Sequence, residues 1–170
     1  MKRSLCSAAL LIGAVVACGD RQRAAEPNLE RAARNLVGFL RGELPFDSRA
    51  LADTVELRIA PEGGGAVNRV SREALRERSA WTVAGPARRF RLVPPATFST
   101  VSTKVGRHFN CQEQDLATRA PDLASRPHVG VRLQPEGAQS CLQSWNATFV
   151  FDTAGGSPRL ITVLYDQWEW

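Results

Sequence analysis

The sequence lacks most of the short motifs that identify a known chemistry. It has no CxxC pair and two histidines in all, so the ligand spacing typical of a structural zinc site is missing. Gly63-Gly64-Gly65 is not followed by the GK[S/T] of a phosphate-binding loop, and Ser140 and Ser144 do not lie in a nucleophile-elbow pattern. No nucleic-acid-binding motif and no internal repeat is present. The sequence therefore predicts no metal site, no cofactor and no nucleic-acid partner.

A hydrophobic run long enough to cross a membrane is also missing. The apolar segment Leu5–Ala17 is shorter than the about 20 residues that a spanning helix needs. It follows the positive residues Lys2 and Arg3, as the apolar part of an export signal does. The end of this segment and the cysteine after it, Val15-Val16-Ala17-Cys18, resemble the lipobox of bacterial lipoproteins.

This resemblance implies cleavage before Cys18, a thioether-linked lipid on its sulfur, and acylation of the new amino group by a chain such as palmitate. We therefore expect a signal peptide at residues 1–17, a lipidated tether at 18–27 and a single domain at 28–170, held at the bacterial cell envelope by its lipid. The alternative is an ordinary signal peptide cut after Ala17. Whether the inner or the outer membrane holds the protein stays open.

The mature chain has a modest positive charge. Loss of Lys2 and Arg3 with the signal lowers the formal net charge from +5 to +3. Three arginines, Arg88, Arg89 and Arg91, surround Phe90, and in an exported protein this cluster suits an anionic lipid or envelope polymer better than DNA. A solvated loop or edge strand explains the same cluster and is the favoured interpretation.

Two cysteines remain once Cys6 is lost with the signal and Cys18 is acylated. These are Cys111 and Cys141. An oxidising compartment favours their pairing, and the absence of CxxC spacing argues against a metal site. We predict a Cys111–Cys141 disulfide.

Hydrophobic spacing predicts helices first and strands afterwards. The expected helices are residues 28–41, a short turn capped by Asp47, and 72–78. The expected strands are 55–59, 98–111, 129–133, 141–151 and 160–164, with a loop containing one helical turn at 112–127. This order indicates an α+β fold in which N-terminal helices pack on a curved antiparallel sheet.

The element order and the closing segment LITVLYDQWEW resemble the NTF2-like family, including its SnoaL-like members. The resemblance implies a long helix, a short helix and strand, a third helix, and four strands that form a cone. A cystatin-like α+β fold is the alternative. The predicted disulfide and the long 112–127 segment depart from the simpler family members.

The resemblance also implies a place for chemistry, because enzymatic members often hold a His with an Asp or Tyr in the cone. The candidates here are His108 with Asp166 or Tyr165. Tyr165 and Asp166 have opposite parity, so they cannot both point inward from one regular strand. The favoured alternative is that His108 is a sheet residue on the face opposite Phe109, and that His128 is a loop residue.

The aromatic C-terminus has two interpretations as well. Tyr165, Trp168 and Trp170 could form a ligand or protein contact surface, or they could close the core, which is the favoured interpretation. Taken together, these features favour a non-enzymatic, lipid-tethered envelope domain that binds a small apolar ligand or an envelope protein through its sheet concavity. The alternative is a SnoaL-like isomerase, cyclase or hydrolase that uses His108 and Asp166.

Overall fold

The computed structural model describes residues 28–61, 65–86 and 88–166. Residues 28–41 are helical, as predicted, and the chain leaves this helix at Gly42, whose φ of 81° lies in the left-handed region that glycine adopts without strain. The next turn is a short 3-10 helix, η1 (Ser48–Ala50), whose predicted cap is confirmed because the Asp47 side chain accepts a hydrogen bond from the Arg49 amide.

A mixed sheet of six strands forms the centre of the domain. Its strands lie side by side in the order β2 (Val67–Ser71), β1 (Leu51–Ile59), β8 (Arg159–Tyr165), β7 (Trp145–Asp152), β6 (His128–Gln134) and β5 (Ser99–Val105). The α+β class is therefore as predicted. The prediction of an antiparallel sheet is wrong at one place, because β1 and β8 pair in parallel while the other neighbours are antiparallel. Parallel pairing needs a long connection, and here almost the whole domain lies between the two strands.

The short helix predicted at 72–78 is replaced by two 3-10 turns, η3 (Ala74–Arg76) and η4 (Arg78–Ala80). The Leu75 carbonyl, which an α-helix would use for its own ladder, instead accepts a hydrogen bond from the indole of Trp81 at 2.9 Å. The chain then forms a separate two-stranded ribbon of β3 (Thr82–Ala84) and β4 (Arg89–Arg91). Arg89 and Arg91 of the basic cluster are exposed on this ribbon, with Phe90 buried between them.

Two predicted strands are shorter than expected. The strand predicted at 98–111 ends at Val105, because Gly106 turns the chain with a φ of 68°. The strand predicted from Cys141 begins at Trp145, because η5 (Cys141–Gln143) comes first, with the Ser140 hydroxyl accepting a hydrogen bond from the Leu142 amide. Within the predicted loop at 112–127, the structure has the expected helical turn, α2 (Leu116–Arg119).

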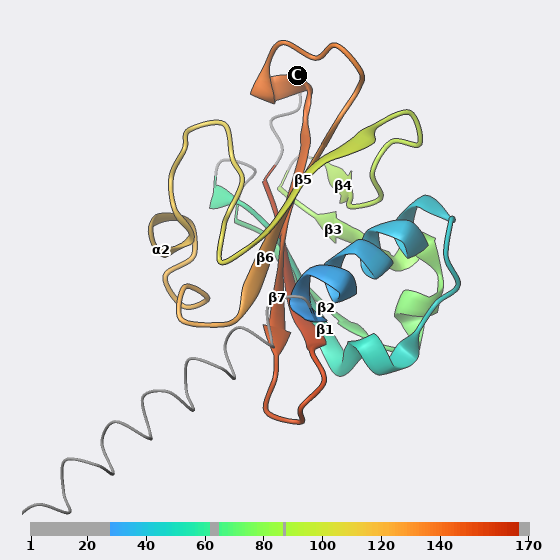
Figure 1. The fold of residues 1–170 in the computed structure, drawn as a ribbon. Helices are drawn as coiled ribbons and strands as arrows, with labels where there is room; N and C mark the ends of the chain where they lie inside the picture. The colour runs from blue at the N-terminus through green and yellow to red at the C-terminus, as the bar shows by residue number, and fades with distance from the viewer. Residues whose placement is uncertain (1–27, 62–64, 87, 167–170) are drawn as a thin grey trace, which may run out of the picture.

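The sheet is covered on both faces. The helix at residues 28–41 packs over one face together with η3 and β3, and the main core between them includes the fully buried Trp81, Trp145 and Phe149. The 107–127 segment, which we call the cover segment, lies over the other face (Figure 1). Its Leu116, Ala120 and Leu123 pack against Val150 and Leu164 of the sheet. Within the described ranges, no helix has the length and apolar character needed to cross a membrane.

Candidate functional site

The cover segment approaches the sheet closely because a glycine lies beneath it. Gly130 pairs with Thr148 across β6 and β7, on the face that the cover segment covers. A Cβ placed on Gly130 would collide with the carbonyl oxygen of Arg107 and lie 3.0 Å from the Phe109 ring. The missing side chain therefore lets residues 107–109 pass directly over β6, which brings His108 next to Thr148.

His108 lies in this loop rather than in a strand, so the interpretation of His108 as a sheet residue opposite Phe109 is wrong. The cause is the early end of β5 at Val105. Both His108 and Phe109 are buried. The other histidine, His128, was expected in a loop but is the first residue of β6.

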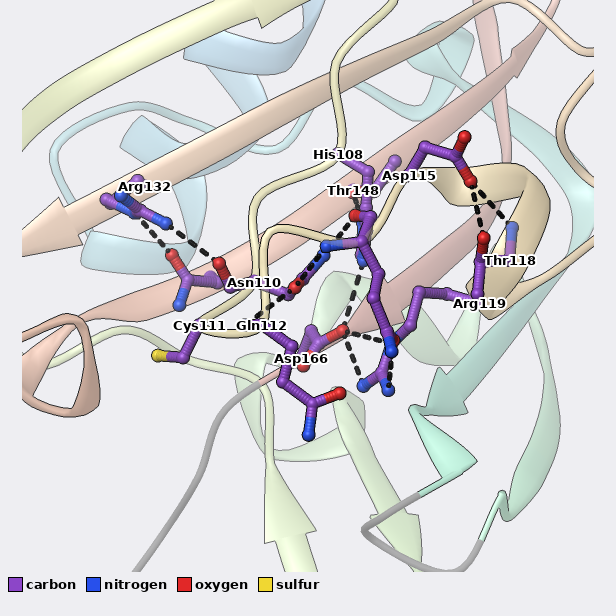
Figure 2. A network of polar contacts seen from close by, with 12 residues as sticks. His108, Asn110, Cys111, Gln112, Asp115, Thr118, Arg119, Arg132, Thr148 and Asp166 are labelled. Carbon is purple, nitrogen blue, oxygen red and sulfur yellow. Dashed lines mark hydrogen bonds and ion pairs between the residues drawn. The ribbon is translucent and has the colours of Figure 1, made fainter.

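The structure brings the two predicted catalytic residues together. His108 Nε2 lies 3.1 Å from Asp166 Oδ2, and His108 Nδ1 lies 2.7 Å from Thr148 Oγ1 (Figure 2). In the neutral imidazole, Nε2–H donates to the carboxylate and Nδ1 accepts from the Thr148 hydroxyl. The His108 side chain has an exposed fraction of 0%. Both ring nitrogens therefore have a protein partner and neither is open to solvent.

Asp166 also binds a cation, Arg119, that sequence reasoning missed. Arg119, from the last turn of α2, donates to Asp166 Oδ2 from Nε at 3.1 Å and from Nη2 at 2.9 Å. Both side chains are almost completely buried, with exposed fractions of 3% and 2%. Asp115 caps α2, the turn that carries this arginine: its carboxylate accepts from the Thr118 amide at 2.8 Å and from the Thr118 hydroxyl at 2.9 Å.

Together, His108, Thr148, Asp166 and Arg119 form a buried polar network that joins the cover segment to β7 and to the residue after β8. A general acid or base must reach a proton on its substrate. Here the acceptor and donor positions of His108 are used within the protein. These hydrogen bonds and the ion pair hold the cover segment on the sheet.

The remaining predicted site residues lie elsewhere. Tyr165 is on the opposite face of β8 from Asp166, as its parity predicts, and its ring lies 6.0 Å from that of Trp145 in the main core. Tyr165 therefore contributes to the core. Trp168, Trp170 and Cys18 lie outside the described residues.

Cys111 and Cys141 form a disulfide, with their Cα atoms 5.4 Å apart. The bond joins the cover segment to η5, the turn that precedes β7. It also borders a pocket of about 360 Å³, which we call the Arg132 pocket. The lining residues include both cysteines together with Arg107, His108, Phe109, Asn110, Glu113, Asp115, His128 and Arg132.

Arg132 is a half-buried charged residue of this pocket that sequence reasoning missed. It lies on β6, half-buried, opposite Asn146, whose side-chain oxygen accepts from Arg132 Nε at 2.9 Å. Arg132 Nη2 donates to the Asn110 carbonyl at 3.3 Å (Figure 2). Its guanidinium also lies 4.9 Å from the centre of the Phe109 ring, and that of Arg107 lies 5.6 Å from the same ring.

Burial lowers the pKa of the Arg132 guanidinium, and the positive charge of Arg107 lowers it further, while the charge of Glu113 acts in the opposite direction. Among the described residues, Arg132 has no carboxylate within ion-pair distance, and its hydrogen-bond acceptors are neutral. The pocket therefore contains a partly desolvated cation without a counter-ion.

Adding a methyl group at Gly130 tests how closely the cover segment approaches the sheet. Gly130→Ala is expected to lower the free energy of unfolding by about 1–3 kcal/mol, because the new Cβ forces the Arg107 backbone away and separates His108 from Thr148. Urea denaturation measures the change. Gly155→Ala, in the turn between β7 and β8 with no heavy atom within 4 Å of the added Cβ, is the matched control. Equal stability of the two variants would contradict this description of the cover segment.

No cluster of three or more metal-ligating side chains occurs in the part of the chain that the structure describes. Comparison with known proteins found no matching family model, no matching curated protein and no matching solved structure.

Proposed function

We propose that this chain is a lipid-anchored domain of the bacterial cell envelope that binds a small ligand or another envelope protein without transforming it. The lipobox Val15-Val16-Ala17-Cys18 supports the anchor. The observation that carries the non-catalytic role is the complete use of the two His108 ring nitrogens, by Thr148 and Asp166, in a side chain with no exposed surface.

The Arg132 pocket is the proposed binding site, in place of the sheet concavity that the sequence suggested. In the main core between the sheet and the helix at residues 28–41, Trp81, Trp145 and Phe149 each have at most 1% of their surface exposed. These side chains occupy the space in which an apolar ligand was expected. The Arg132 pocket instead is an open pocket of about 360 Å³, within the size range of small-molecule sites, and it is lined by charged and polar groups.

The second candidate function is a SnoaL-like enzyme, an isomerase, cyclase or hydrolase, and the contact between His108 and Asp166 favours it. Such chemistry also requires a cavity lined by both residues. His108 lines the Arg132 pocket, but Asp166 is not among the residues that line it. Catalysis would therefore require the cover segment to open, with loss of the Arg119–Asp166 ion pair.

We further propose that the fold is of the NTF2-like type. Support comes from the order of a long helix, η1, β1, β2, the turns η3 and η4, and the last four strands of the main sheet. The β3–β4 ribbon departs from the order that the family resemblance implies. An experimental structure in which the six strands lie flat, without the curvature of a cone, would exclude this assignment.

The lipid anchor is tested by Cys18→Ala in the bacterium that makes the protein. The unaltered chain is expected to enter the detergent phase of a Triton-type phase partition and to carry acyl chains on residue 18 by mass spectrometry. The variant is expected to lose the lipid and move to the aqueous phase, because alanine has no sulfur to which the lipid can be attached. An unaltered chain found in the aqueous phase with an unmodified sulfur would exclude the anchor.

A further inference from the structure

We propose that the Arg132 pocket binds an oxyanion, the carboxylate or phosphate group of a small molecule, between Arg132 and Arg107. This rests on the proposed binding function and names the chemistry of its ligand. The positive charge of Arg132 is energetically costly where it lies in this pocket. A guanidinium that is partly removed from water and has neutral acceptors alone is destabilising, and an anion that enters the pocket removes this cost.

The free donors of the two arginines define where the anion binds. Arg132 uses Nε for Asn146 and Nη2 for the Asn110 carbonyl, which leaves Nη1 without a hydrogen-bond partner among the described residues. Arg107 is exposed and makes no hydrogen bond within the described ranges. Both guanidinium groups lie beside the Phe109 ring, which limits their positions. We therefore expect an oxyanion that enters the pocket to accept from Arg132 Nη1 and from the planar fork of Arg107.

In the structure, the two carboxylates that line the pocket, Asp115 and Glu113, do not occupy the proposed anion position between Arg132 and Arg107. Asp115 is occupied as the N-cap of α2, where hydrogen bonds to Thr118 also lower its pKa. Glu113 is exposed, and no ion pair within 4.0 Å joins it to Arg107 or Arg132 among the described residues. Its negative charge nevertheless raises the pKa of Arg132, against the larger lowering by burial and by Arg107. Glu113 is therefore a weak internal competitor for the incoming anion.

The test is an NMR titration of the full chain in mild detergent with two probes, inorganic phosphate and succinate. Saturable shifts are expected at the Arg132 Nε–H and at the backbone amides of residues 106–115, with at least one probe. A response to phosphate alone or to succinate alone supports the proposal and identifies the group that binds. If neither probe gives saturable shifts at these positions, the proposal is wrong.

Variants distinguish direct contact from general surface charge. Arg107→Gln is expected to weaken binding about tenfold or more, which corresponds to 1.4 kcal/mol or more. It should leave the fold intact because Arg107 is exposed. Glu113→Gln is expected to strengthen binding, since it removes the competing carboxylate. Lys104→Gln is the matched control, because it removes one exposed positive charge on β5 that does not line the pocket.

Equal weakening by Lys104→Gln and Arg107→Gln would overturn the proposal, since it would indicate general charge attraction. So would weaker binding in Glu113→Gln. Arg132→Gln should abolish binding, and its folding is checked by the spectrum of the free protein. Attachment to the membrane is measured separately by phase partition, so an absent anion site would leave the lipid anchor unaffected.

Discussion

Replacing Cys111 and Cys141 together by serine is expected to lower the free energy of unfolding by about 3–4 kcal/mol, the chain-entropy cost of opening a loop of this length. The two cysteines are 30 residues apart and enclose most of the cover segment and all of β6. Without the bond, the unfolded chain gains the freedom of that loop. Since typical domains are stable by about 5–15 kcal/mol, this is a large share of the total.

Chemical denaturation with and without a reductant measures this effect. The unaltered protein should lose the same 3–4 kcal/mol, to within about 1 kcal/mol, when it is reduced, and the double variant should not respond to reductant. Two free thiols in the exported protein, or a double variant as stable as the unaltered chain, would contradict the pairing of Cys111 with Cys141.

Removing the carboxylate of Asp166 is expected to have the other large effect. Asp166→Ala should destabilise the protein by about 3–5 kcal/mol, because it leaves the buried Arg119 cation without its partner. His108 loses its Nε2 acceptor in the same change. The loss should be concentrated in the cover segment, whose backbone amides should exchange their hydrogens faster in the variant.

An exposed ion pair provides the control for this prediction. Glu30→Gln breaks the contact between Glu30 and Arg34 on the N-terminal helix, whose side chains are 38% and 54% exposed. The expected cost is about 0.3–0.5 kcal/mol, because solvent screens such pairs. If Asp166→Ala is as mild as Glu30→Gln, the network does not hold the cover segment in place.

Local patterns in the sequence were sufficient to predict much of the fold. The helix at 28–41, its end at Gly42 and the cap at Asp47 depend on neighbouring residues, as do the alternating strand at β6 and the continuously apolar strand at β8. These predictions are confirmed. The parallel pairing of β1 with β8 was missed because it joins segments far apart in the chain. The third helix was wrong because the Trp81 indole takes the Leu75 carbonyl, a contact that helical spacing does not encode.

The candidate site, like the fold, could be predicted only in part from the sequence. His108 and Asp166 were selected by residue type and family resemblance, and they are in contact. Arg119 was missed because it lies in a segment expected to be mostly loop, and its partner is 47 residues away. The one available signal was Gly130, because a glycine inside a strand often marks the close approach of another part of the chain.

The most direct test of the central claim, that His108 has a structural role between Thr148 and Asp166, is NMR of the imidazole nitrogens and their protons. The second histidine, His128, is partly exposed and provides an internal reference. We expect a proton on His108 Nε2 that exchanges with water much more slowly than the ring protons of His128. Equally fast exchange at the two rings would show that His108 is open to solvent, and it would contradict the structural role.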